Sequence, residues 1–199
     1  MIEVEKKFIL SQSDVDHLIN GAAFLGQKDF TDIYYDTDKF ILTANNKWLR
    51  SREGKFELKI PFCKNTKGSV DQYKELEVEY IIRENLGLSQ NNSIIEALEQ
   101  AEYSSFCICK TTRKKYKKGL FTIDLDIVDF QDFIYVVGEI ELMIDDELKI
   151  EEAVCKIISF AEDHGLSVAP VRSKVIEYLK QLRPEHYQRL VYAGVVDDY

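Results

Sequence analysis

The sequence opens with Met1-Ile2-Glu3-Val4-Glu5-Lys6-Lys7, a stretch in which charged and apolar side chains alternate. A β-strand directs every second side chain to the same face, so Glu3, Glu5 and Lys7 would form one row with a spacing of about 6.6 Å. The opposite face would be mostly apolar. A single strand of this kind can be an ordinary surface strand whose charged face meets solvent, so the pattern gains weight only if it recurs.

The alternation returns in later segments that are rich in β-branched and aromatic residues and are separated by turn residues. Nearly every one has an apolar face and an ionic face, which predicts an antiparallel sheet. The expected strands cover residues 2–8, 30–36, 48–52, 55–60, 72–81, 104–117, 120–127 and 134–142. The ionic rows are acidic at Glu3/Glu5, Glu75/Glu77/Glu79, Asp124/Asp126 and Glu139/Glu141, and basic at Arg50/Arg52 and Arg113/Lys115/Lys117.

Between and after these strands, apolar residues recur at helical spacing. The spacing predicts amphipathic helices at 13–20, 93–101 and 150–164, and further helices opened by Pro170 and Pro184. The expected fold is therefore α+β, mainly β, with an eight-stranded antiparallel β-barrel and flanking helices. The alternation alone leaves open whether the ionic rows face solvent or the interior, because buried charges are costly unless they are paired or bind a metal.

Length and composition indicate a single domain over residues 1–199. The net charge of −9 argues against a nucleic-acid or anionic-membrane partner. No apolar run is long enough to span a bilayer and no signal-peptide pattern is present, so a cytoplasmic location is expected. The cysteines have the spacing of neither a zinc site nor a disulfide framework, which predicts reduced structural thiols at Cys63, Cys107, Cys109 and Cys155.

An ionic interior would have a specific chemical use. Arg and Lys side chains neutralise phosphate oxygens, and Arg can do so through two parallel hydrogen bonds. Clustered carboxylates bind Mg²⁺ or Mn²⁺, which also coordinate phosphates. Acidic and basic rows in one cavity therefore describe a metal-dependent polyphosphate site.

These segments, in this order, resemble the motifs of the CYTH superfamily, the triphosphate tunnel metalloenzymes. Glu3-Val4-Glu5-Lys6-Lys7 matches the Glu-x-Glu-x-Lys motif, which is weak evidence alone, whereas the ordered set is specific. The segment 182–190 resembles the end of animal thiamine triphosphatases. The other matching motifs are Tyr34-Tyr35-Asp36-Thr37, Trp48-Leu49-Arg50-Ser51-Arg52, Glu57-Leu58-Lys59, Tyr73-Lys74-Glu75-Leu76, Asp124-Leu125-Asp126, Gly138-Glu139-Ile140-Glu141 and Ser173-Lys174.

The resemblance implies a barrel with inward-facing ionic rows, in which a triphosphate is hydrolysed with Mg²⁺, or with Mn²⁺ in its place. By position, the metal-binding carboxylates correspond to Glu3, Glu5, Asp124, Glu139 and Glu141. The substrate-binding cations correspond to Lys7, Arg50, Arg52, Lys59, Arg113 and Lys174. Catalysis is expected to depend on Glu3, Glu5, Lys7, Glu139 and Glu141. The residues expected to orient the cations and balance charge are Asp126, Lys115, Lys117 and the Glu75/Glu77/Glu79 row.

The single tryptophan, Trp48, is the candidate for recognising the part of the substrate beyond the phosphates. An aromatic face attracts a positively charged ring such as the thiazolium of thiamine. Packing on the outer face of the barrel is the alternative, since Trp48 shares a face with Arg50 only if the strand is regular. The histidines, His17, His164 and His186, are scattered and are expected on the surface or in helices.

The predicted function is hydrolysis of thiamine triphosphate to thiamine diphosphate and phosphate by a monomer. An inorganic triphosphatase is the nearest alternative, because the basic residues recognise phosphate rather than the organic group. Class IV adenylate cyclases and RNA triphosphatases share the same scaffold, but purine-reading contacts are not identifiable and the net charge disfavours an RNA-guiding surface. The non-enzymatic alternative is a polyphosphate-binding module, against which the complete set of metal carboxylates argues.

Overall fold

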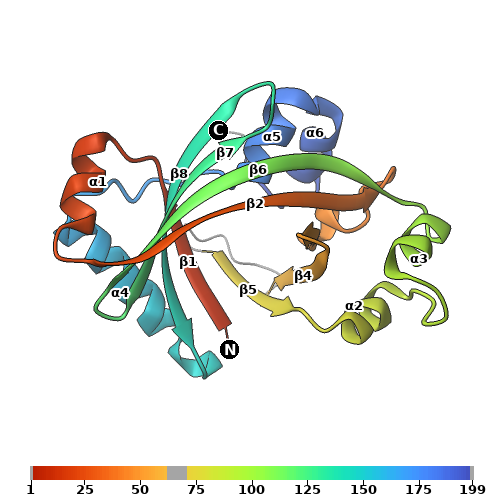
Figure 1. Ribbon diagram of the computed structural model, residues 1–199, viewed down its shortest axis with the longest axis horizontal. Coiled ribbons are helices and arrows are strands. Elements are labelled where there is room, and N and C mark those ends of the chain that lie inside the picture. Colours follow the sequence, from red (N-terminus) through yellow and green to blue (C-terminus); the bar gives the residue numbers. More distant parts are fainter. Residues whose placement is uncertain (1, 62–70, 198–199) are drawn as a thin grey trace. The chain divides into compact units, whose positions relative to one another are not determined.

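The computed structural model describes residues 2–61 and 71–197 (Figure 1). Within these residues eight strands close into an antiparallel β-barrel in the order β1-β5-β4-β3-β2-β6-β7-β8. The fold class expected from the sequence is confirmed. The strands are β1 (Ile2–Phe8), β2 (Ala23–Thr37), β3 (Trp48–Arg52), β4 (Lys55–Pro61), β5 (Asp71–Leu76), β6 (Tyr103–Lys118), β7 (Phe121–Asp129) and β8 (Ile134–Ile144).

Apart from α2, which was not predicted, the described α-helices lie close to where the apolar spacing predicts them. Ser11 and Ser93 cap two of them, each in a reciprocal capping box with the acidic residue three positions later. None of the described helices is both long and apolar enough to cross a membrane. The α-helices are α1 (Gln12–Ile19), α2 (Glu79–Leu86), α3 (Ile94–Gln100), α4 (Ile150–Asp163), α5 (Lys174–Leu182) and α6 (Pro184–Tyr192), with 3₁₀ turns η1 (Thr43–Asn45) and η2 (Glu147–Lys149).

The prediction of one strand over residues 72–81 is wrong in its second half. Strand β5 ends at Leu76 and helix α2 begins at Glu79, so Glu79 does not continue the acidic row. Helical spacing prevails here because it buries Ile82 completely, and because Arg83 pairs with Glu79 one turn earlier at 2.6 Å. Helix α5 likewise begins at Lys174 rather than at Pro170.

The described chain divides into two compact units. The first comprises residues 2–30, 71–74 and 110–174, and the second comprises residues 31–61, 75–109 and 175–197. Strands β2, β5 and β6 contribute residues to both units. The single domain over residues 1–199 stays a prediction, and each unit is described by itself below.

In the first unit, the apolar faces of β1, β7 and β8 pack against helix α4. Val4, Ile123 and Ile140 have no exposed surface and share a core with Ile157 and Ala161 of the helix. Because α4 covers this face from outside the barrel, the alternate, ionic side chains of the same strands point toward the interior. This is the orientation that the family resemblance implied.

In the second unit, strands β3 and β4 pack against helices α2 and α3. Leu49 and Leu58 are fully buried together with Ile82 of α2 and with Ala97 and Leu98 of α3. The alternate residues of β3 and β4 again carry the charges. Both units therefore follow one rule, in which helices cover the apolar side of a strand and leave the ionic side to the interior.

The described cysteines are thiols. Cys107 and Cys109 lie buried on β6, and Cys155 is exposed on α4. Cys63 lies outside the described residues.

Candidate functional site

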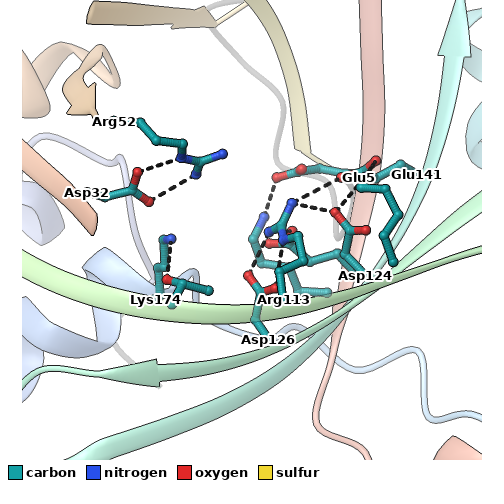
Figure 2. Close-up of polar contacts among 12 residues, drawn as sticks. Glu5, Asp32, Arg52, Arg113, Asp124, Asp126, Glu141 and Lys174 are labelled. Atoms are coloured by element: carbon teal, nitrogen blue, oxygen red, sulfur yellow. Dashed lines mark hydrogen bonds and ion pairs between the residues drawn. The ribbon is translucent and has the colours of Figure 1, made fainter. Parts of the chain in front are cut away.

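Strand pairing in the first unit aligns charged residues that are far apart in the sequence (Figure 2). Glu5 of β1 lies opposite Glu141 of β8, and Lys7 lies opposite Glu139. Glu139 lies opposite Asp124 of β7 on its other side. Directly opposed residues of an antiparallel pair project to the same face, so these side chains form one ionic surface.

Most charged side chains of this surface are buried, and Glu139 is half-buried. Asp124 is 0% exposed, Asp126 1%, Glu5 6%, Lys7 7% and Glu141 8%. Removing an ion from water costs on the order of several kcal/mol, and only close partners or a bound cation offset that cost. The contacts around these side chains therefore determine whether they can remain charged.

Arg113 of β6 is the cation with the most carboxylate contacts in this network. It contacts Asp126 at two points, from Nε to Oδ1 at 2.7 Å and from Nη2 to Oδ2 at 2.6 Å. It also donates to Asp124 and, at 2.8 Å, to Glu139. Burial opposes the charge of Arg113, but the carboxylates of Glu139, Asp126 and Asp124 outweigh this effect and raise its pKa above the ordinary range.

Two lysines also contact carboxylates of this network. Nζ of Lys7 lies 2.5 Å from Glu5. Nζ of Lys115 lies 2.9 Å from Asp124 and 3.5 Å from Glu141.

Lys117 continues the row of Arg113 and Lys115 along β6, as expected, and pairs with Thr122. Its side chain is exposed and donates to the carbonyl oxygen of Leu120 at 2.8 Å, in the turn between β6 and β7. A position at the end of a strand gives a long side chain access to water, and strand parity alone does not show this.

Two groups of carboxylates in the first unit could hold metal ions. One is Glu3, Glu5 and Glu141, and the other is Asp124, Glu139 and Glu141. In each group one oxygen per residue lies within 4.8 Å of the others. Glu141 belongs to both groups. The structure thus brings together all five carboxylates that the sequence resemblance assigned to the metal.

Two further observations indicate that a divalent cation fits these residues. Oδ1 of Asp124 is buried without a hydrogen-bond partner, which is costly for a carboxylate oxygen that binds nothing. Burial, and next the negative charges of Asp124 and Glu3, raise the pKa of Glu141 to about 8. The donors are all carboxylate oxygens, which is the ligand set that Mg²⁺ and Mn²⁺ prefer.

The second unit holds a separate set of predicted substrate-binding cations. Arg52 contacts Asp32 at two points, Nε to Oδ1 at 2.7 Å and Nη2 to Oδ2 at 3.0 Å (Figure 2). Arg50 lies 2.7 Å from Glu57 and 3.8 Å from Asp32. Asp32 is completely buried, and these arginines offset part of the cost of burying its charge.

A third acidic group, Glu57, Glu75 and Glu77, also has its oxygens within 4.8 Å of one another. Ion pairing accounts for it, since Glu57 pairs with Arg50 and Glu75 lies 2.6 Å from Lys59. Glu77 is exposed. This group therefore orients cations in the way that was expected for Glu75.

Strand pairing places Trp48 opposite Lys59, on the same face as Arg50. The strand is regular, so the alternative that Trp48 packs on the outer face is wrong, and Leu49 occupies that face instead. The residue is 7% exposed, and its indole Nε1 donates to Asn46 at 2.9 Å.

The sequence reasoning missed three residues of these networks. They are Asp32, which holds two arginines, and Thr111 and Phe30, which contact Lys174. The available signal for Asp32 was an aspartate in the middle of a β-rich run, where this residue type is disfavoured without a specific role. Of the histidines, His17 is exposed and all three lie in or at the end of helices, but His186 is buried.

Comparison with known proteins identifies the family. The model of the CYTH domain matches residues 1–171. Human thiamine-triphosphatase is 31% identical over 211 aligned positions, covering 96% of this chain and 90% of the human protein, and the Macaca fascicularis enzyme gives the same values. A solved Pyrococcus horikoshii OT3 protein has a TM-score of 0.69 at 22% identity, covering 90% of this chain and 99% of its own.

A solved Hippeastrum protein, for which a dominant triphosphatase activity is described, has a TM-score of 0.59 at 16% identity, with 92% of this chain and 97% of that one covered. At such low identity the two solved structures establish a shared fold only. The family model and the curated relatives extend over most of the sequence. The chain therefore belongs to the CYTH domain family, as a relative of hydrolases of the thiamine-triphosphatase type.

Proposed function

We propose that this protein hydrolyses thiamine triphosphate to thiamine diphosphate and phosphate with the help of Mg²⁺. The observation that carries the proposal is a group of five carboxylates, three of them buried, that includes partners of Arg113, in a chain that is 31% identical to thiamine-triphosphatases. Carboxylates in such number supply the ligands of a divalent cation, and the adjacent cations supply positive charge for phosphate oxygens.

The metal would be held by Glu3, Glu5, Asp124, Glu139 and Glu141. When bound, it would supply Lewis acidity toward phosphate oxygens and lower the pKa of a water molecule. Mn²⁺ satisfies the same ligands. Asp124 is suited to this role because its Oδ2 already accepts from Arg113 while its buried Oδ1 has no hydrogen-bond partner.

The cations of the first unit would bind and orient the substrate. Lys7, Arg113 and Lys174 are proposed to contact phosphate oxygens, and Lys115 to hold Asp124 and Glu141 in place. Positive charge near the leaving and equatorial oxygens stabilises the charge that develops in phosphoryl transfer. The substrate would displace part of the carboxylate contacts that these cations now make.

In the second unit, Arg50, Arg52 and Lys59 are proposed as substrate-binding cations on the strength of their positions in the family motifs. Trp48 lies on the same strand face as Arg50 and is proposed to contact the thiazolium ring. The cytoplasmic location, the monomeric state and the absence of nucleic-acid and membrane partners remain predictions from the sequence.

The alternative function is hydrolysis of inorganic tripolyphosphate. It is supported by the larger number of proposed phosphate-binding side chains, compared with Trp48 as the proposed contact for an organic group. Trp48 is the residue whose substitution separates the two functions.

The test is phosphate release by the purified protein with Mg²⁺, comparing thiamine triphosphate, inorganic tripolyphosphate and ATP. We expect the highest kcat/KM for thiamine triphosphate, loss of all activity in Glu139→Gln, and normal activity in Glu152→Gln, an exposed glutamate of α4 that pairs with Lys156. Trp48→Leu should lower kcat/KM for thiamine triphosphate and spare tripolyphosphate. A preference for tripolyphosphate would replace the proposed function by the alternative, and inactivity on all three would refute both.

A further inference from the structure

Phe30 is the first buried residue of strand β2, with 3% of its surface exposed, whereas the residues before it are mostly exposed. Two cations contact its ring. Nζ of Lys174 lies 5.4 Å from the ring centroid, and Cζ of Arg113 lies 5.7 Å from it. Both are proposed substrate-binding residues, and all three residues belong to the first unit. One uncharged side chain thus contacts two cations that are distant from it in the sequence.

An aromatic face differs from a carboxylate as a partner for such cations. Its quadrupole attracts a cation placed over it, yet the ring carries no net charge. A carboxylate would neutralise the cation and repel an incoming phosphate. The ring therefore orients Lys174 and Arg113 without adding to the negative charge that Asp124, Asp126 and Glu139 already place beside Arg113.

Thr111 provides a second neutral contact. It is completely buried on β6, and its Oγ1 accepts a hydrogen bond from Nζ of Lys174 at 3.2 Å. Thr111 lies two residues before Arg113 and therefore on the same face of the strand. Lys174 itself is the first residue of helix α5, so these contacts hold its long side chain against strands of the barrel.

We propose that Phe30 is a positioning residue for triphosphate binding, which orients Lys174 and Arg113 through its ring face, with Thr111 as a secondary support for Lys174. This inference rests on the proposed function, because it concerns the same substrate. If it is correct, weakening the negative potential on the face of the Phe30 ring lowers the affinity for polyphosphate and changes kcat less.

The decisive experiment replaces Phe30 by mono-, di- and trifluorinated phenylalanine. Fluorine withdraws the electron density of the ring face but leaves its shape almost unchanged, so a role in packing predicts no trend. We expect KM for the triphosphate, and the dissociation constant of inorganic tripolyphosphate measured by calorimetry, to rise stepwise to about five- to tenfold, on the scale of cation–π energies. Unchanged constants along the series would overturn the proposal.

Conventional variants provide a second route. Phe30→Leu should raise KM at least as much, Phe30→Tyr should retain most of the affinity, and Thr111→Val should raise KM by about two- to threefold, the scale of one hydrogen bond. The matched control is Phe121→Leu, since Phe121 stacks on Phe160 in the apolar core of the same unit. An equal rise of KM in this control would assign the effect of Phe30→Leu to packing and refute the positioning role.

A double-mutant cycle with Lys174→Ala shows whether Phe30 acts through that lysine. We expect Phe30→Leu to have a clearly smaller effect on KM in the Lys174→Ala background, whereas equal effects in both backgrounds would contradict the proposal. Activity of the unmodified protein is measured first. If it hydrolyses no triphosphate but still binds tripolyphosphate, the proposed function fails while the binding measurements still decide the role of Phe30.

Discussion

The two units of this protein hold an arginine in the same way but surround it differently. Arg113 donates from Nε and Nη2 to the two carboxylate oxygens of Asp126, and Arg52 donates in the same way to Asp32. The first network then combines six carboxylates with four cations, a surplus of negative charge. Its members are Glu3, Glu5, Asp124, Asp126, Glu139 and Glu141 against Lys7, Arg113, Lys115 and Lys174. The second network, counted without the exposed Glu77, combines three with three, namely Asp32, Glu57 and Glu75 against Arg50, Arg52 and Lys59.

The difference in balance has a direct electrostatic consequence. In the first unit, burial and neighbouring carboxylates raise the pKa of Glu141 to about 8, and burial also raises the pKa of Asp126. In the second unit, burial opposes the charge of Arg50, but Tyr34, Glu57 and Asp32 raise its pKa well above the ordinary range. We infer that the excess of carboxylates prepares the first cluster for a divalent cation, whereas in the second cluster the neighbouring groups keep Arg50 charged, as a proposed substrate-binding cation must be.

The largest expected effect is that of Asp124→Asn. The substitution removes one charge and one oxygen from the proposed metal ligands, so we expect kcat/KM to fall by about a thousandfold or more. The measurement is steady-state hydrolysis at saturating Mg²⁺. The control is Asp163→Asn, an exposed aspartate at the end of α4 in the same unit. Activity within about tenfold of the unmodified protein would break the assignment of the acidic cluster to the metal.

The second effect is stabilisation by the metal. Since the surplus of negative charge destabilises the folded state, we expect saturating Mg²⁺ to raise Tm by several degrees, in line with about 2.7 kcal/mol at a hundredfold excess over Kd. In the absence of Mg²⁺, the Glu141→Gln variant should have a higher Tm than the unmodified protein. On addition of Mg²⁺, its Tm should rise by less. An equal gain in both proteins would show that Mg²⁺ binds elsewhere.

The third effect concerns the balanced cluster. Asp32→Asn keeps the shape of the side chain but removes the charge that orients Arg50 and Arg52, so we expect KM to rise about tenfold with a smaller change in kcat. Kinetics on tripolyphosphate provide the measurement, and Asp38→Asn, an exposed aspartate just after β2, is the control. A fall in kcat with constant KM would contradict a role in substrate binding.

The smallest effect is a pH dependence of stability in the second unit. His186 lies between Phe40 and Phe106 and 2.7 Å from the hydroxyl of Thr43, and burial lowers its pKa to about 4. His186 binds a proton more readily in the unfolded chain than in the folded protein. The contribution of the buried, neutral ring to the free energy of unfolding is therefore complete above about pH 6.5 and is lost as the pH falls toward 4. Between about pH 6.5 and 5.5 we expect a loss on the order of 1 kcal/mol.

Urea unfolding of the unmodified protein and of His186→Gln provides the measurement. The difference in the free energy of unfolding between the two proteins should shrink as the pH falls. A constant difference over this range would mean that His186 does not titrate with a lowered pKa. The charges nearest to it, Asp36 and Arg183, oppose each other, which leaves burial as the main cause.

Much of the fold could be predicted from the sequence because β-strands have a strict period of two. The alternation in residues 2–8, 120–127 and 134–142 predicted these strands. It also predicted that Glu3 and Glu5 share one strand face and that Glu139 and Glu141 share another. The prediction that Glu79 continues a strand failed, because over a few residues the same sequence fits both the alternation of a strand and the spacing of a helix. Burial of Ile82 against the second core decided that case, and such burial exists only in the folded chain.

The sequence by itself determined which residues share a face, and the ordered motifs determined the family. The tertiary structure decided the strand register that sets Lys7 opposite Glu139 and Arg113 opposite Asp126, and it decided which face helix α4 covers. It also brought Phe30 and Asp32 to the cations that they contact. The reason is that side-chain parity is a local property of one strand, whereas pairing and burial depend on contacts between segments far apart in the chain.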